Sequence, residues 1–544
     1  MTVKIIIKDI MSNLSSFFSI AYLAIFFPLC LIVYSITPTK HKKYCLLLFS
    51  LIFYWLLCGQ AFFFLVATII ITYLFGILMD KVYIKRDTLL KNIDDKEKKI
   101  NIKKGYKKRS KIILIISLVI LVGTIITIKY LPFFADNLNR VLVSSNAVNL
   151  IRIPKFIVPI GISFFVLSAI SYLVDVYTEK IKADYNLFRL SLFLSFFPQI
   201  IEGPICRYEQ TANQLWNICE IKYDNFILGI ERILYGLLKK CVIADRLNPL
   251  ITELFDKYYE YNGIFVIIAG ISYTIQLYAD FSGSMDAVIG ISQIFGVIVP
   301  ENFRQPFFSK TISEFWNRWH ISLGSWFSDY VFYPITMSKT MKSLTLKIKK
   351  KYNNHFGPII SSSIALLCVW LLNGLWHGAG WTFIFYGLYH FFFILLGNIC
   401  DPISKKLSRK LSINSDSIAL NIFKIVRTTI LVCVGETIFR ANDLKTAKAM
   451  FSHLMSSFSI SKLNLLCYGK LGIDYLDILI VFITLSIVFF VSFYKERGVS
   501  VRSAINTKNN IIKYGIIISL IVFIAIFGAY GPGYIPIDPM YANF

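Results

Sequence analysis

Apolar stretches of about 20 residues recur from one end of this chain to the other, separated by short polar segments. An α-helix needs about that length to cross the ~30 Å hydrocarbon core of a bilayer. The pattern therefore predicts an all-α, polytopic integral membrane protein whose residues 1–544 form one membrane domain. The first span reads as a retained helix rather than a cleaved signal peptide. The predicted spans are 17–36, 45–59, 61–79, 112–131, 157–177, 187–204, 263–281, 285–299, 359–376, 381–398, 421–438, 477–494 and 511–529.

The stretch 157–400 differs from the rest because polar, glycine and proline residues interrupt its apolar runs. Non-helical backbone at membrane depth is tolerated only where protein or a water-filled cavity covers it. We therefore expect a cavity in this stretch and place the catalytic core there. No internal repeat is evident at a period typical of solenoids or inverted-repeat transporters.

The distribution of charge agrees with a membrane protein. Only 16% of the residues are charged, 56% are hydrophobic, and the formal net charge is +25. The excess of lysine and arginine lies between predicted spans, at 40–43, 80–112 and 339–351. By the positive-inside rule, 80–112 is a basic cytoplasmic loop and the N-terminus lies outside. Membrane lipid is thus an expected partner, and nucleic acid is not, because the flanks are transmembrane and few aromatics are interleaved.

Several common chemistries find no support. The ten cysteines show no C-x-x-C motif or paired spacing, so neither a disulfide framework nor a metal site is predicted. The chain also lacks the P-loop, the G-x-S-x-G elbow and the H-E-x-x-H zinc motif. Direct group transfer with a histidine general base, and with no bound cofactor, is the simplest remaining chemistry.

His320 ends a tryptophan-rich run. Thr311 and Glu314 have the spacing of a capping box and predict a helix that begins there. His320 would share the apolar face of that helix, flanked by Asn317 and Arg318. It is either a group that lines the cavity at membrane depth or a structural or interfacial histidine. The expected face comprises Ile312, Phe315, Trp316, Trp319, His320 and Leu323.

His377 lies between two apolar runs, at a break rich in glycine (Gly374, Gly378 and Gly380), with Asn373 one turn before it. Glycine lets the chain bend and lets its backbone approach a substrate closely. Packing alone explains such a histidine poorly, so the pattern favours a functional role. His390 stands in a continuous apolar helix and is expected to be a hydrogen-bonded core residue.

Two acids, Asp280 and Asp286, interrupt the apolar sequence between the runs 263–281 and 285–299. Asp280 could orient a histidine or an acceptor hydroxyl. Alternatively it could be the buried ionic partner of an arginine such as Arg318, since pairs of this kind are common in membrane bundles.

The motifs of this region resemble those of the membrane-bound O-acyltransferase family, in particular its bacterial branch with the alginate O-acetylation membrane subunit. The resemblance is firm over about 159–396. The runs that carry it are Pro159–Phe165, Tyr172–Tyr177, Phe197–Gln199, Gly203–Ile205, Ile243–Arg246, Asp280–Gly283, Pro300–Phe303, Glu314–Leu323 and Gly374–Ala379, with Phe439–Ala441 as a weaker match.

The resemblance implies a ring of tilted helices around a tunnel in a bacterial cytoplasmic membrane. It implies a catalytic role for His377 and a catalytic or structural one for His320. The donor would be a cytosolic acyl thioester such as acetyl-CoA. The acceptor would be the hydroxyl of an extracytoplasmic glycan, reached directly or through an acetyltransferase-type partner protein. The candidate substrate-binding residues are Asp280, Ser282, Trp316, Arg318, Trp319, Asn373 and Trp376.

The sequence departs from the family pattern after Gly283, where Ser284-Met285-Asp286 is one residue short, and at Ser328, where relatives often carry arginine. Two alternatives therefore stay open beside polysaccharide O-acetylation. One is D-alanyl transfer to teichoic acid, since that branch shares the Trp-His runs. The other is a non-enzymatic glycan or lipid transporter, which would be expected to tolerate loss of His377.

Overall fold

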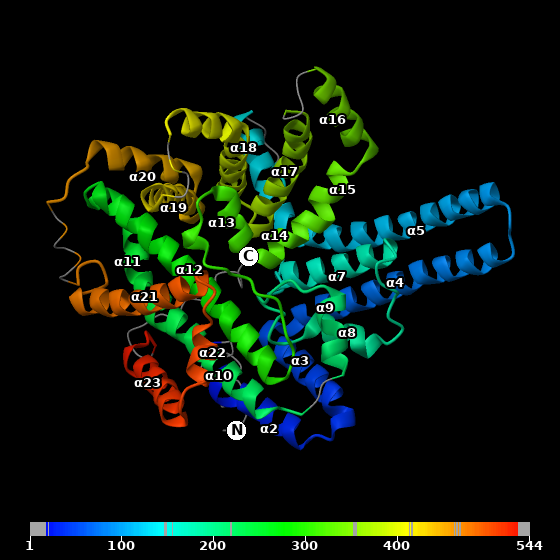
Figure 1. Ribbon diagram of the computed structural model, residues 1–544, viewed down its shortest axis with the longest axis horizontal. Coiled ribbons are helices and arrows are strands. Elements are labelled where there is room, and N and C mark those ends of the chain that lie inside the picture. The colour runs from blue at the N-terminus through cyan, green and yellow to red at the C-terminus, as the bar shows by residue number, and fades with distance from the viewer. Residues whose placement is uncertain are drawn as a thin grey trace. The chain divides into compact units, whose positions relative to one another are not determined.

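Helices make up most of the computed structural model, which describes residues 18–19, 21–145, 150–154, 156–217, 220–351, 356–412, 414, 417–461, 463, 466 and 469–530 (Figure 1). The only β-type pairing found in these ranges is an isolated bridge between Phe303 and Trp319. The all-α prediction is therefore confirmed. The chain divides into two units, residues 1–229 with 291–300, and residues 230–290 with 301–540.

Eight helical segments among the described residues are long and apolar enough to cross a membrane. Their outward side chains are apolar as well: Phe482 is 67% exposed and Ile511 is 79% exposed. Such surfaces suit lipid rather than water, which confirms a multi-pass membrane protein. The segments are Thr39–Lys91, Lys96–Ser144, Ile264–Ile294, Gly357–His377, Trp381–Lys410, Ile418–Arg440, Tyr475–Glu496 and Asn510–Phe527.

The first unit is built around a long antiparallel helix pair, α4 and α5, with α7 packed beside it (Figure 1). A short turn at Gly59–Ala61 separates α3 from α4, and Gly59 has a positive φ of 53°. Short 3-10 and π turns, labelled η, interrupt or extend several helices. The α-helices of this unit are α2 (Phe27–Ile36), α3 (Lys42–Cys58), α4 (Phe62–Lys91), α5 (Lys96–Ile125), α6 (Leu131–Ser144), α7 (Ile162–Tyr177), α8 (Leu187–Ser195) and α9 (Tyr208–Trp216).

The segment 80–112, predicted as a basic cytoplasmic loop between spans, is helical over almost its whole length, because α4 and α5 run through it. Lysine, leucine and glutamate are good helix formers, and Asp95 caps α5 by accepting hydrogen bonds from the N–H groups of Glu97 (2.8 Å) and Lys98 (3.3 Å). Arg86 anchors the charged end of the pair through a bidentate contact with Glu179 at 2.8 and 2.6 Å. The side of the membrane on which this hairpin lies stays a prediction.

Two predicted spans in the first unit are shorter as helices than expected. The segment 187–204 is helical only in α8, which ends at Ser195, because Pro198 and Pro204 cannot continue a helix. The segment 157–177 becomes helical at Ile162, after Gly161, whose φ is 73°.

The second unit holds the remaining helices, and α10 and α12 contribute residues to both units. The helices are α10 (Tyr223–Leu237), α11 (Asp245–Asp256), α12 (Ile264–Ile294), α13 (Ile312–Arg318), α14 (Ile321–Phe327), α15 (Tyr333–Thr336), α16 (Lys339–Lys351), α17 (Phe356–His377), α18 (Trp381–Lys410), α19 (Ile418–Arg440), α20 (Leu444–Ser456), α21 (Tyr475–Glu496), α22 (Val501–Asn506) and α23 (Asn510–Phe527).

The two spans predicted at 263–281 and 285–299 form one continuous helix, α12, so the predicted break there was wrong. Gly283 lies where α12 crosses α10 closely. A Cβ added to Gly283 would lie 2.8 Å from the Gly236 carbonyl oxygen, and one added to Gly236 would lie 2.5 Å from that of Gly283. Small residues allow two helix backbones to approach this closely. The glycine therefore serves helix packing rather than a break in the helix.

Candidate active site

A cavity of about 260 Å³ in the second unit brings the two tryptophan-flanked histidines, His320 and His377, into one lining. The segment from α13 to η8 (Ser328–Phe332) supplies one wall, and α17 supplies most of the other. The lining residues are Ser313, Trp316, Asn317, Trp319, His320, Leu323, Gly324, Phe327, Ser328, Phe332, Leu366, Val369, Trp370, Asn373, His377 and Ile394.

His320 does not continue the helix that Thr311 begins. The predicted N-cap is present, since Thr311 Oγ1 accepts from the Glu314 N–H at 3.1 Å, but α13 ends at Arg318. His320 has a left-handed φ of 48°, and α14 begins after it. A residue other than glycine is costly in that region, and such strain is often found at functional sites.

The helix breaks because its backbone pairs with the segment that contains Asn302. The Arg304 N–H donates to the Arg318 carbonyl at 2.9 Å, and the Ile321 N–H donates to the Asn302 carbonyl at 3.0 Å. These two hydrogen bonds use the groups that an uninterrupted helix would need for its own ladder. The predicted continuous apolar face is therefore wrong beyond Arg318.

The surroundings of His320 hold its ring in place. Its Nδ1 lies 3.3 Å from Asn302 Oδ1, which also accepts from the Ser322 N–H at 2.9 Å. The rings of Phe281 and Trp376 pack against it with centroids 4.8 and 5.4 Å away. His320 itself lies in none of the spanning helices. Burial, together with the nearby His377, lowers the pKa of His320 well below its usual range, so the ring is neutral at neutral pH.

His377 is the last residue of α17 and is 4% exposed. The predicted glycine break sets its position, since α17 and α18 pack side by side (Figure 1). A Cβ on Gly374 would lie 2.4 Å from the Phe383 carbonyl oxygen, so only glycine allows this approach. The His377 ring contacts Trp376 and Phe439, each with centroids 5.1 Å apart.

A buried acid that the sequence reasoning missed lies behind this histidine. The Tyr386 hydroxyl donates to Glu436 Oε1 at 2.8 Å, and Glu436 on α19 is 1% exposed. Tyr386 in turn faces His377, with ring centroids 6.0 Å apart. An ionisable residue inside the apolar run 421–438 was the available signal, because such residues in spanning segments usually serve a function.

Further polar atoms around the cavity are buried without a hydrogen-bond partner among the described residues. They are Trp316 Nε1, Asn373 Oδ1 and both ring nitrogens of His390. His390 is fully buried against Trp316 and Tyr386, as expected of a core residue, but its predicted hydrogen bonds are absent from the described part of the chain. Buried polar groups normally have a partner, so those on the cavity wall are suited to hydrogen bonds with a polar ligand or water.

Four predicted substrate-binding residues, Asp280, Ser282, Arg318 and Trp376, are not in the lining of this cavity. Asp280 pairs with Lys240 at 2.7 Å, so it is a buried ionic partner as in the alternative considered above, but for a lysine. Ser282 accepts from Lys239 at 2.8 Å. Arg318 instead pairs with Glu314 and Glu496, each at 2.7 Å. The structure places Trp316, Trp319 and Asn373 on the cavity wall and Trp376 against the His320 ring.

The sequence matches a family model over residues 26–347, the membrane-bound O-acyltransferase family. The chain belongs to this family. His320 lies inside the matched range, and His377 follows it.

Curated relatives agree with the family match. A probable alginate O-acetylase AlgI of Pseudomonas aeruginosa is 33% identical over 62% of this chain, and the match spans 59% of that relative, less than two thirds of its length. A peptidoglycan O-acetyltransferase of Helicobacter pylori is 33% identical over 51% of this chain and 53% of its own. A teichoic acid D-alanyltransferase of Bacillus subtilis is 33% identical over 52% of this chain and 68% of its own.

Proposed function

We propose that this protein is an O-acyltransferase that moves acetyl from a cytosolic thioester to the hydroxyl groups of a cell-envelope or secreted polysaccharide, directly or through a partner protein. The observation that carries the proposal is the pair His320 and His377, which line one cavity from separate segments of an acyltransferase-family chain. Acetyl is the preferred acyl group because the relatives named above include acetylating enzymes of two polysaccharides.

The reaction needs one proton acceptor and one positioned thioester. His377 removes the proton from the acceptor hydroxyl as its oxygen attacks the thioester carbonyl. The carbon–sulfur bond then breaks, the ester forms, and the proton passes to the departing thiolate. A general base in this role typically contributes a rate factor of about 10²–10⁴. Burial of His377 keeps bulk water away from the thioester, which limits its hydrolysis.

The neutral ring of His320 complements this base. Asn302 and the flanking aromatic rings hold it rigidly, so it can bind and orient the reacting groups without reorganising. Tyr386, whose hydroxyl donates to Glu436, packs against the His377 ring and supports it. Trp316 Nε1 and Asn373 Oδ1 supply a donor and an acceptor to an acceptor sugar, whose hydroxyl groups can do both.

D-alanyl transfer to teichoic acid is the second candidate function. The Bacillus subtilis relative favours it, because this chain covers 68% of that protein. The chemistry at His377 would be the same, and only the acyl group and the polymer would differ.

The test is to delete the gene in its host, restore it in a second strain, and release ester-linked acyl groups from the isolated polysaccharides with mild base. We expect acetate to fall on deletion and to return on complementation. D-alanine that falls in place of acetate would move the chain to the second candidate. Ester content of every kind that is unchanged by deletion would contradict both and favour the transporter alternative.

A further inference from the structure

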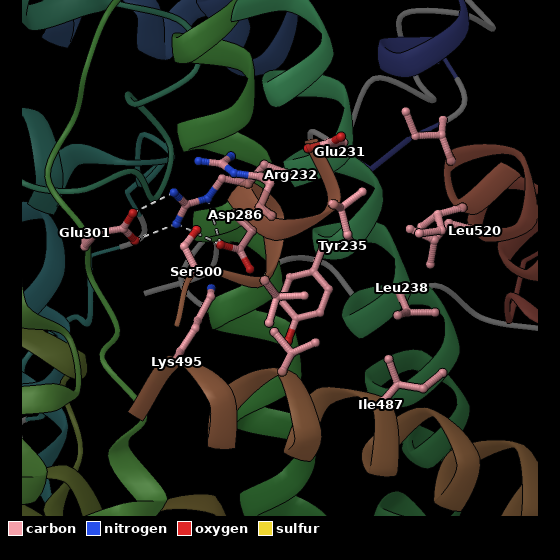
Figure 2. Close-up of a pocket in the computed structure, with 16 residues that line it drawn as sticks. Glu231, Arg232, Tyr235, Leu238, Asp286, Glu301, Ile487, Lys495, Ser500 and Leu520 are labelled. Carbon is pink, nitrogen blue, oxygen red and sulfur yellow. Dashed lines mark hydrogen bonds and ion pairs between the residues drawn. The ribbon is translucent and has the colours of Figure 1, made fainter. Parts of the chain in front are cut away.

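The second unit holds another cavity, of about 350 Å³, which shares no lining residue with the histidine cavity. It lies among α10, α12, α21, α22 and α23. In Figure 2 its labelled polar residues Arg232, Asp286, Glu301, Lys495 and Ser500 gather at one side, while Leu238, Ile487 and Leu520 lie at the other. The cavity is thus amphipathic.

The acids at the polar side are largely neutralised by their own partners. Arg232 makes a bidentate contact with Glu301 at 2.6 and 2.5 Å and a further bond to Asp286 at 3.0 Å. Lys239 approaches Asp286 to 2.6 Å. Arg232 and Lys239 thus offset the charges of Asp286 and Glu301, and the four side chains form a neutral ionic cluster.

The cavity holds more basic than acidic side chains. Lys495 and Arg502 also line it, and the single further acid is Glu231, which attracts Arg502 and accepts from the Asn506 side chain at 3.0 Å. Ser500 caps α22 by accepting from the Ser503 N–H at 3.2 Å, which leaves its hydroxyl hydrogen able to donate. Lysine, arginine and a hydroxyl are the usual ligands of a phosphate group.

The charged residues of this cavity lie at the ends of membrane-spanning helices. Lys495 lies one residue before the end of α21, and Ser500 and Arg502 lie in the short connection to α23, so the charges sit where two spanning segments end. The apolar wall comes from the spanning parts of the same helices, through Ile487 and Ile517 among others. A ligand here would have a charged head at the membrane boundary and a chain along the bilayer.

We propose that this cavity binds the headgroup and proximal chain of an anionic glycerophospholipid from the surrounding membrane. The phosphate contacts Lys495, Arg502 and Ser500, and the acyl chain lies along Ile487 and Ile517. A zwitterionic lipid gains less from the excess of cationic side chains. The proposal does not depend on the acyl-transfer reaction, since no residue assigned to that reaction lines this cavity.

The test uses the full-length protein purified in detergent and native mass spectrometry to count bound lipid during titration with phosphatidylglycerol or with phosphatidylcholine of the same chains. The double variant Lys495→Gln, Arg502→Gln should bind phosphatidylglycerol about thirtyfold more weakly, because two basic residues near an anionic lipid contribute of order 1 kcal/mol each, and every 1.4 kcal/mol is a factor of about ten. The matched control is Arg497→Gln, Lys508→Gln, which removes the same charge from nearby exposed positions outside the lining.

A second variant tests whether the lipid binds inside the cavity or only to a basic surface. Ile517→Trp should weaken phosphatidylglycerol binding while all charges stay, because the larger side chain fills space on the apolar wall. Glycerol 3-phosphate, which has the head without chains, should not compete. Equal binding of phosphatidylcholine, equal weakening by the control pair, or unchanged binding to Ile517→Trp would each overturn the proposal. Displacement of the lipid by acetyl-CoA would also overturn it and assign the cavity to the acyl donor.

Discussion

The buried ionic contact of Asp280 with Lys240 predicts that Asp280 has a structural rather than a catalytic role. Lys240 is 1% exposed and its Nζ lies 2.7 Å from Asp280 and 2.8 Å from Asp245. In Lys240→Met both carboxylates lose their shared cation. Removing one partner of a buried ion pair typically costs about 3–5 kcal/mol. We therefore expect the largest loss of thermal stability from this variant, and little change from the exposed control Lys339→Met.

Asp280→Asn is the informative partner of that experiment. Lys240 keeps Asp245, and the asparagine amide oxygen can still accept one hydrogen bond, so the loss should be smaller, of order 1.5–3 kcal/mol for one charge-assisted hydrogen bond. The assay heats the detergent-solubilised protein, measures the folded fraction by size-exclusion chromatography, and determines transferase activity per folded molecule. We expect a lower melting temperature with activity per folded molecule nearly unchanged. Activity that vanishes at an unchanged melting temperature would refute the structural assignment of Asp280.

Three further predictions follow from contacts near the site. Tyr386→Phe should lower turnover about fivefold without unfolding the protein, as the hydrogen bond that supports Glu436 is worth of order 1 kcal/mol; unchanged steady-state kinetics would contradict this. Gly283→Val should sharply reduce the yield of folded protein in detergent because of the helix crossing, whereas Gly105→Val, with no neighbouring atom within 4 Å, should not. The wild type should lose stability as the pH falls below about 6.5, because the pKa of His320 is lowered in the folded state and the unfolded state therefore binds the proton first. In melting experiments, His320→Gln should lose less stability than the wild type between pH 7.5 and 5.5.

The sequence was most informative for helices that consist of one long apolar run. The spans at 359–376, 381–398, 421–438, 477–494 and 511–529 correspond to α17, α18, α19, α21 and α23, because long apolar runs with polar ends leave one solution in a membrane. The helices within the charged segment 80–112 were not predicted, since positive charge indicates topology and carries no information on whether the backbone is helical.

The errors near the site have a common cause in contacts between distant parts of the chain. Periodicity predicted that His320 continues a helix, and the pairing of Asn302 with Ile321 that breaks it cannot be read from local spacing. The same limit explains why two spans were predicted at 263–281 and 285–299, although Gly283 lies inside one helix and meets Gly236 in a helix crossing. One alternative for Asp280 was a buried pair with an arginine such as Arg318, and its partner is Lys240, since sequence shows that a buried acid needs a cation but not which one.

The motifs predicted the histidines of the cavity but not the buried acid behind them. His320 and His377 stood out because imidazoles are rare and costly in apolar sequence, and the structure places both on one cavity. Glu436 escaped notice because it stands alone in its run, and only the fold brings it to Tyr386 and His377.

The most direct test of the proposed reaction compares His377→Ala with wild type in cells that carry equal amounts of each protein in the membrane. His41→Gln, a change at an exposed histidine, serves as the control. Ester-linked acetate on the polysaccharides is released with mild base and quantified. If His377 is the general base, ester acetate falls to the level of the deletion strain in His377→Ala and stays at the wild-type level in the control. Wild-type ester acetate in the His377→Ala strain would contradict the central claim.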